Sequence, residues 1–230
     1  MINSTAVFLF SLDGGEQSSW LKKLDGSLDQ FVQIRETQPD TNFFGRNSIV
    51  HFLAHTAGNH PETLIIGASA CGEIRAALAF SPTIIDAVEM VGSIIEAERN
   101  TFKDYGGGLY AHPEVKAVAG EGRSYLRSID KKYDIIQMFS NHSSSSIAQG
   151  SGAAGTVYLQ TEEAYLEYFS HLKNDGILQI NRHIYPRMLT TAAQAWERFG
   201  RKDFWKYALV LETTATDVDT LPTVLIKMTP

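Results

Sequence analysis

From residue 41 onward, short apolar runs of strand length alternate with longer stretches in which apolar residues recur at helical spacing. The early runs are apolar on both faces, as expected for strands of a parallel sheet that helices cover on each side. Such an alternation is typical of βαβ units. The strands that we predict are residues 63–67, 84–89, 115–119, 134–139, 177–181, 208–213 and 223–228.

The segments between these strands carry the spacing and the end signals of helices. Thr161 is typical of an N-cap, and the Asn-Asp-Gly turn at residues 174–176 is expected to end the helix that begins there. A further helix, residues 48–57, is predicted to lead into the first strand. The other predicted helices are residues 72–80, 93–102, 122–128, 161–172 and 187–199.

The first 40 residues follow a different pattern. Two short alternating segments, residues 6–12 and 31–36, are separated by Gly-containing turns at residues 13–15 and 25–26. Turns of this kind between alternating segments predict a small β region. We therefore expect two units, an N-terminal β region at residues 1–40 and a larger α/β domain at residues 41–230.

Composition narrows the class of protein. With 230 residues, 43% of them hydrophobic, the chain can bury a sizeable core. Its formal net charge of −6 argues against a general nucleic-acid binder, and no apolar run approaches the roughly 20 residues of a membrane helix. The single cysteine, Cys71, excludes an internal disulfide and fits a reducing, cytoplasmic location. No metal site is predicted.

Ligands of an open α/β sheet bind beyond the carboxyl ends of its strands, so the residues after each predicted strand are the candidates for function. The first strand is followed by a Gly-x-Ser-x-x-Gly variant of the nucleotide-binding turn, from Gly67 to Gly72. Gly67 permits the tight turn and Gly72 permits close helix packing. Because a strand-turn-helix needs glycine with or without a ligand, both interpretations stay open. The candidate binding residues in this turn are Gly67, Ala68, Ser69 and Gly72.

Two further strand ends place carboxylates at the same edge. Glu89 follows Gly67 by 22 positions, close to the ~20-residue spacing at which an acidic side chain accepts hydrogen bonds from ribose hydroxyls. Met90 is predicted to pack on a base, with ordinary core packing as the alternative. Glu121, followed by Gly122, is a candidate acceptor for the exocyclic amine of adenine. The alternatives are a solvated carboxylate at Glu89 and favourable helix electrostatics at Glu121.

The fourth strand runs into a Ser- and Gly-rich stretch, residues 143–155. His142 precedes this stretch and is a candidate general base, because imidazole titrates near neutral pH. The alternative is a solvated histidine beside a polar loop. Residues 143–146 are interpreted either as a substrate lid or as a linker.

These residues resemble the spermidine synthase-like branch of the class I S-adenosylmethionine-dependent methyltransferase superfamily. The resemblance spans residues 43–182 and is most specific in the Gly-Gly-Gly-Leu-Tyr run at residues 106–110, followed by His-Pro-Glu-Val at residues 112–115. The chain is especially similar to the cytosolic domain of large bacterial membrane-bound members. Whether it is part of a longer membrane-anchored protein stays open.

The resemblance implies a Rossmann-like, seven-stranded class I methyltransferase sheet with helices on both faces, plus a small N-terminal β appendage. It implies S-adenosylmethionine or its decarboxylated form as the ligand and a small-molecule acceptor, with a homodimer as the common assembly of such synthases. By the same resemblance, residues 67–69 would approach the amino-acid end of the nucleoside, Glu89 the ribose, and Met90 one face of adenine. Glu121 with Gly122 would lie at the adenine edge.

The chain departs from the polyamine synthase pattern at positions that handle charge. The resemblance places an acidic residue that holds the aminopropyl ammonium where this chain has Ala70. It places a proton-accepting Asp where this chain has Phe139, and a second acidic position at His142. A polycation bound without carboxylates would leave its ammonium groups poorly compensated, so we do not expect authentic spermidine synthesis.

Two functional hypotheses follow from different classes. The first is a transferase that binds an S-adenosylmethionine-type nucleoside and moves a methyl or aminopropyl group to an unidentified small acceptor, with catalysis resting largely on positioning. The second is a catalytically inactive relative that serves as a sensor or interaction domain. A nicotinamide-dependent oxidoreductase ranks last, because it would share the glycine turn and Glu89 but leave Glu121 without a role.

Overall fold

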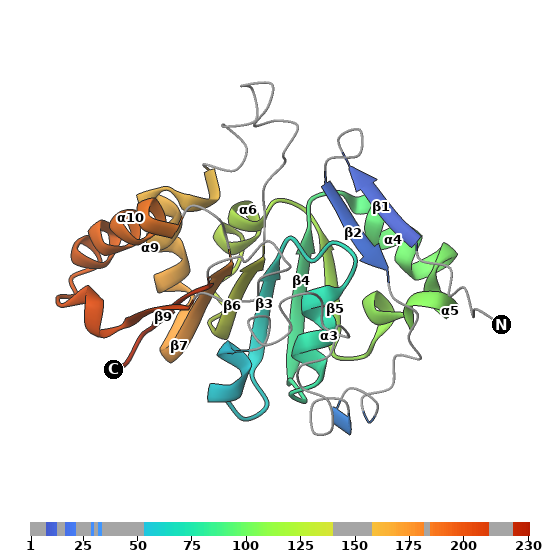
Figure 1. The fold of residues 1–230 in the computed structure, drawn as a ribbon, viewed down its shortest axis with the longest axis horizontal. Coiled ribbons are helices and arrows are strands. Elements are labelled where there is room, and N and C mark those ends of the chain that lie inside the picture. Colours follow the sequence, from blue (N-terminus) through green and yellow to red (C-terminus); the bar gives the residue numbers. More distant parts are fainter. Residues whose placement is uncertain are drawn as a thin grey trace.

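The computed structural model describes residues 8–12, 17–21, 29, 32–33, 53–139, 158–181, 185–211 and 223–230. These residues form a two-stranded sheet and a seven-stranded sheet with helices on both of its faces (Figure 1). No helix among these residues is both long and apolar enough to cross a bilayer.

The seven-stranded sheet has the order β5-β4-β3-β6-β7-β9-β8. Its first five strands are parallel, and β9 runs antiparallel to both β7 and β8. All seven predicted strands are therefore confirmed, and the last two form an antiparallel pair. The strands are β3 (Glu62–Ile66), β4 (Ile84–Glu89), β5 (Val115–Ala119), β6 (Tyr133–Phe139), β7 (Leu172–Asn181), β8 (Ala208–Leu211) and β9 (Thr223–Lys227).

Helices and short helical turns connect these strands. The α-helices are α3 (Gly72–Leu78), α4 (Gly92–Glu96), α5 (Lys103–Gly106), α6 (Gly122–Arg127), α9 (Glu162–Ser170) and α10 (Tyr185–Arg198). The short turns are η2 (Ala54–Ala57), η3 (Ala97–Thr101), η4 (Leu109–Ala111), η5 (Tyr158–Gln160) and η6 (Phe204–Lys206).

Different helices bury the two faces of the sheet, because consecutive residues of a strand point to opposite sides. In β3, Leu64 and Ile66 pack in the cluster that includes residues of α6, α9 and α10, whereas Ile65 packs in the cluster with α3 and α4. All three side chains are at most 3% exposed. Burial of each such side chain contributes about 1.5–3 kcal/mol, which explains why β3 has no polar face.

Aromatic side chains join α9, α10 and η6 at one end of the sheet. Trp196 is fully buried, 5.2 Å from the ring of Phe169 and 4.9 Å from that of Tyr207, and its indole Nε1 donates to the carbonyl of Lys202. The aromatic residues of this segment therefore pack mainly in the core. Trp205 is the exception, since 65% of it is exposed.

Three predicted boundaries were wrong. The helix predicted for residues 93–102 is interrupted, because η3 is a π turn in which the Phe102 amide donates to the Ala97 carbonyl. The helix α9 ends at Ser170, and β7 already begins at Leu172. Residues 174–176 therefore lie inside a strand, where a register shift opposite Tyr133 and Ile135 accommodates them, and do not end a helix.

The N-terminal predictions are correct in part. Strands β1 (Phe8–Leu12) and β2 (Gln17–Leu21) pair antiparallel, so the segment at residues 6–12 does contain a strand. The polar β2 sequence was not predicted as a strand, and residues 32 and 33, expected to be extended, are helical. The predicted lead-in helix is described from residue 53 onward, where it is the 3-10 turn η2. Residues 48–52 lie outside the described part.

Candidate functional site

The turn after β3 is held by backbone hydrogen bonds to the neighbouring strand. The amides of Gly67 and Ala68 both donate to the Val88 carbonyl, at 2.8 and 3.2 Å, and the Cys71 amide donates to the Ala68 carbonyl at 3.0 Å. Gly67, Ser69 and Cys71 all have positive φ, of 79°, 39° and 65°. Ser69 and Cys71 therefore adopt a backbone conformation that is uncommon outside glycine and typical of functional turns.

Glu89 lies at the end of β4 and joins the first two strand ends. Its Oε2 accepts from the Ser69 amide and its Oε1 accepts from the Val91 amide, each at 2.8 Å. The residue is 6% exposed, so it is not a solvated carboxylate. Since an ionised carboxylate offers about four acceptor positions, both oxygens keep capacity for a further donor.

Met90 follows Glu89 and points away from the core. It is 72% exposed, which excludes ordinary core packing. An exposed apolar side chain and a buried carboxylate thus lie next to each other at one strand end, and the packing of Met90 on a base stays a prediction.

The segment singled out by its Gly-Gly-Gly-Leu-Tyr run packs behind the glycine turn. Gly107 and Gly108 have positive φ and lead into η4, which buries Leu109 and Tyr110. The Tyr110 hydroxyl donates to the Ser69 carbonyl at 2.8 Å, and burial raises the pKa of Tyr110 well above its usual value. The sequence motif indicated that this segment matters, but not that it contacts Ser69, 41 residues earlier in the chain.

Glu121 is the N-cap of α6. Its carboxylate accepts from the amides of Arg123 and Ser124, both at 2.9 Å. The favourable helix electrostatics considered above are therefore observed. The Glu121 oxygens can accept further hydrogen bonds, so a contact with adenine stays a prediction.

Gly122, the first residue of α6, lets the helix approach β3 closely. A Cβ at this position would lie 2.4 Å from Cγ2 of Ile66. Because Glu89 pairs with Ala119 and Ile66 pairs with Val88, the ends of β3, β4 and β5 lie at one edge of the sheet. The structure thus brings the glycine turn, Glu89 and the start of α6 together, as the sequence predicted.

An ion-pair cluster between α6 and α9 was not predicted from the sequence. Arg123, 2% exposed, donates to both Glu167 oxygens and to the Tyr158 carbonyl, and its guanidinium lies 4.2 Å from the Tyr158 ring centroid. Arg127 also donates to Glu167, from Nη2 at 2.6 Å. The cluster holds η5, the described segment that follows residues 140–157, against the first turn of α6.

Charged residues are also buried behind the glycine turn, where α3 meets η3. Arg75 and Glu98 are 3% and 1% exposed, and neither Arg75 Nε nor Glu98 Oε1 has a hydrogen-bond partner among the described residues. Burial raises the pKa of Glu98 to about 7, although the nearby Arg75 acts in the opposite direction. Burial also raises the pKa of the Cys71 thiol, so this cysteine stays protonated and is a poor nucleophile.

A buried polar chain crosses β6, β7 and β9 on the sheet face that η2 covers. His55 Nε2 and Gln137 Oε1 lie 2.9 Å apart. In the neighbouring strands Gln179 donates to Asn181, which donates to Thr223 at 2.6 Å. Burial lowers the pKa of His55 to about 4, so the imidazole is neutral near pH 7.

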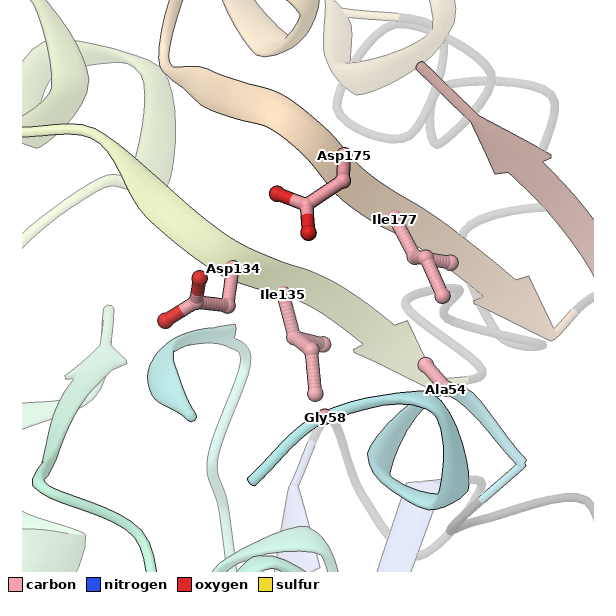
Figure 2. Close-up of a pocket in the computed structure, with 6 residues that line it drawn as sticks. All are labelled: Ala54, Gly58, Asp134, Ile135, Asp175 and Ile177. Carbon is pink, nitrogen blue, oxygen red and sulfur yellow. The ribbon is translucent and has the colours of Figure 1, made fainter. Parts of the chain in front are cut away.

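A small pocket of about 40 Å³ lies at the opposite edge of the sheet, at the amino ends of β6 and β7 (Figure 2). Its lining includes Asp134 and Asp175, and the Asp134 carboxylate is paired with Lys173 at 2.9 Å. The pocket has room for about one water molecule and lies away from the glycine turn, so we do not assign it to the candidate site.

Several candidates fall outside what the structure describes. His142 and residues 143–155 are among them, so the general base and the lid stay predictions. Phe139 is the last residue of β6, and Ala70, 4% exposed, occupies the position where the resemblance places an acidic residue.

Comparisons with known proteins identify the family of this chain. Residues 42–211 match the family model of the spermine/spermidine synthase domain. A polyamine aminopropyltransferase from Clostridium perfringens (strain SM101 / Type A) is 30% identical over 162 residues, which are 70% of this chain and 52% of the relative. The chain spans about half the length of the curated relatives that it matches.

Two solved structures are similar in fold. The spermidine synthase from Thermotoga maritima has a TM-score of 0.54 and 18% identity, over 98% of this chain and 80% of that one. The O-methyltransferase TomG from Streptomyces achromogenes, solved in complex with S-adenosylmethionine, has a TM-score of 0.52 and 16% identity, over 90% of this chain and 92% of that one. The fold is the Rossmann-like class I methyltransferase fold.

Proposed function

This chain belongs to the spermine/spermidine synthase domain family, and we propose that it binds an S-adenosylmethionine-type nucleoside at the carboxyl ends of β3, β4 and β5. We further propose that it transfers a methyl or aminopropyl group from that nucleoside to a small acceptor that is not a standard polyamine. The observation on which this depends most is Glu89, buried at the end of β4 with acceptor capacity left on both carboxylate oxygens.

The residues at this edge fit the parts of such a nucleoside. Glu89 would accept from the ribose hydroxyls, and the exposed Met90 would cover one face of the adenine. Glu121 with Gly122 would lie at the adenine edge. The turn from Gly67 to Ser69 would face the amino-acid end.

The nucleoside supplies a sulfonium-activated carbon when bound. The acceptor's lone pair forms a bond to that carbon while the carbon–sulfur bond breaks, a thioether leaves and the acceptor loses a proton. Such a displacement needs mainly correct positioning, so it does not require a strong base from the chain.

Ala70 supports the proposal that the substrates of this protein differ from those of a standard polyamine synthase. It is buried and uncharged at the position where the resemblance places the partner of the aminopropyl ammonium. The same observation favours a second candidate function, a domain that binds the nucleoside without turnover and acts as a sensor.

The first test is a binding panel. S-adenosylmethionine, its decarboxylated form, S-adenosylhomocysteine, methylthioadenosine and NAD are each added in a thermal-shift assay. A ligand at 100 times its Kd adds about 2.7 kcal/mol to the stability, or roughly 5–10 °C for a domain of this size. We expect the adenosyl sulfur compounds to stabilise the protein and NAD to have no effect. Protection by NAD alone, or by no member of the panel, would overturn the proposal.

Matched variants locate the site. Glu89→Gln should lose most of the ligand-induced shift, whereas Glu96→Gln, an exposed carboxylate on α4, should keep it. Product formation is then followed with each sulfonium donor and a set of amines. Steady-state product excludes the sensor function, and product from putrescine would overturn our exclusion of standard polyamines.

A further inference from the structure

Ser69 is clamped on both sides of its backbone by buried side chains from distant parts of the chain. Its amide donates to Glu89 Oε2, and its carbonyl accepts from the Tyr110 hydroxyl, both at 2.8 Å. Glu89 and Tyr110 are 6% and 1% exposed. The two contacts come from the end of β4 and from η4, so Ser69 lies between them.

This clamp holds a conformation that Ser69 would not keep by itself. A non-glycine residue with φ of 39° stores strain, of the kind that persists where the surroundings over-determine the backbone. Glu89 itself is fixed by its second bond, to the Val91 amide. Removal of one side of the clamp should therefore let the turn relax toward ordinary backbone conformations.

Tyr110 is placed by its own local structure. Gly107 and Gly108 turn the chain with positive φ, and Arg99 Nε donates to the Tyr110 carbonyl at 3.3 Å. The tyrosine ring packs in the buried cluster that includes Ala68 and Cys71, and its hydroxyl reaches the Ser69 carbonyl from within that cluster.

We propose that Tyr110 is a positioning residue, which holds the Ser69 turn in the shape that receives the amino-acid end of the nucleoside. This inference rests on the proposed function and deepens it, because it assigns different residues to the two ends of the nucleoside. Glu89 would affect both ends, because it would contact the ribose and also holds the Ser69 amide. Tyr110 would affect only the amino-acid end, through the Ser69 carbonyl.

The test compares two nucleosides that differ at that end. S-adenosylhomocysteine carries an amino-acid group and methylthioadenosine does not. Isothermal titration calorimetry of Tyr110→Phe should show a Kd for S-adenosylhomocysteine about 10-fold higher than in the unaltered protein, the effect of one lost buried hydrogen bond. The Kd for methylthioadenosine should change less than 3-fold.

Tyr168→Phe is the matched control. Tyr168 is also fully buried and donates to a backbone carbonyl, that of Leu159, at the same distance of 2.8 Å. Both variants lose one comparable hydrogen bond, so a general loss of stability affects both. The ratio of the two Kd values should rise in Tyr110→Phe and stay unchanged in Tyr168→Phe.

A second measurement needs no ligand. Amide hydrogen exchange at residues 68–72 should become faster in Tyr110→Phe and stay unchanged in Tyr168→Phe. Equal changes of both Kd values, or unchanged exchange at the turn, would overturn the positioning role. If the unaltered protein binds neither nucleoside, the proposed function fails, whatever the exchange experiment shows.

Discussion

Arg123 of α6 and Glu167 of α9 form a two-point ion pair, with Nε–Oε2 and Nη2–Oε1 distances of 2.8 Å each. The pair is almost completely shielded on the Arg123 side, and Arg127 donates to the same carboxylate from the exposed side. Parallel hydrogen bonds of this kind fix the orientation of both side chains. The contact thus sets how α6 and α9 lie against one another at the edge that includes the candidate site.

Removal of the Glu167 carboxylate should destabilise the fold strongly. Glu167→Ala leaves the Arg123 charge buried without its partner, which typically costs about 3–5 kcal/mol. Glu162→Ala is the control, because Glu162 lies on the same helix as Glu167 and also pairs with an arginine, but that arginine, Arg198 of α10, is 60% exposed and such pairs contribute less than about 1 kcal/mol. Urea unfolding measures both free energies, and equal losses would contradict the importance of the buried pair.

A methyl group at position 122 should push α6 away from β3. In Gly122→Ala the new Cβ would meet Cγ2 of Ile66 at 2.4 Å, and overpacking of this kind costs about 1–3 kcal/mol. Gly120→Ala places its Cβ in open space, with no heavy atom within 4 Å, and should be neutral or slightly stabilising. Thermal unfolding of both variants tests this, and a neutral Gly122→Ala would contradict the close approach.

His55 should make the folded state less stable in acid. Its pKa is about 4 in the folded protein against 6.5 in its unperturbed state, so the unfolded state binds the extra proton between these values. Stability from this group is complete above pH 6.5 and is lost, by about 3 kcal/mol, as the pH falls through 4. His55→Gln should remove this dependence in urea unfolding experiments at a series of pH values.

Glu98 should act in the opposite direction. Its pKa is about 7 in the folded protein against 4.5, so the folded state holds the proton longer. Stability from protonated Glu98 is complete below pH 4.5 and decreases by about 3 kcal/mol as the pH rises through 7. Between pH 4.5 and 6.5 the two groups oppose each other. The stability of Glu98→Gln should therefore rise with pH in this range, because of His55, and that of His55→Gln should fall, because of Glu98. A slope of the opposite sign in either variant would contradict the assignment that it tests.

Met90 should matter for binding and not for folding. Because Met90 is 72% exposed, Met90→Ala should change the free energy of unfolding by less than about 0.5 kcal/mol. Under the proposed function it should weaken nucleoside binding by removing the surface under the base. Met138→Ala, at a position only 3% exposed, should cost about 2–5 kcal/mol by creating a cavity. Loss of stability without loss of affinity in Met90→Ala would contradict its place at the ligand.

The strands could be predicted because their signal is local. Residues such as Leu64 and Ile66 lie in short apolar runs, and burial on both faces leaves no other place for them. The boundaries near residue 174 could not be predicted, because an Asn-Asp-Gly segment ends helices in most contexts. Here the segment lies inside β7, and a register shift in the pairing with β6 accommodates it. That shift depends on Tyr133, which is distant in the sequence.

The parts of the candidate site that depend on residue spacing could be predicted from the sequence. The parts that depend on contacts between distant segments could not. Gly67 and Glu89 could be placed at one edge because they follow neighbouring parallel strands. The donor role of Tyr110 and the pairing of Arg123 with Glu167 depend on side chains that meet across 41 and 44 positions of sequence, and no local pattern records this.

The interior position of β3 in the sheet has a consequence for synthesis. Strand β3 pairs with β4 on one side and with β6 on the other. On a ribosome that adds about 5–20 residues per second, β6 emerges roughly 70 residues and about 4–14 s after β3. During that interval one edge of β3 has no partner, and unpaired strand edges are templates for pairing with other chains. The aggregation risk of this protein is therefore concentrated in the seconds before its fourth parallel strand leaves the ribosome.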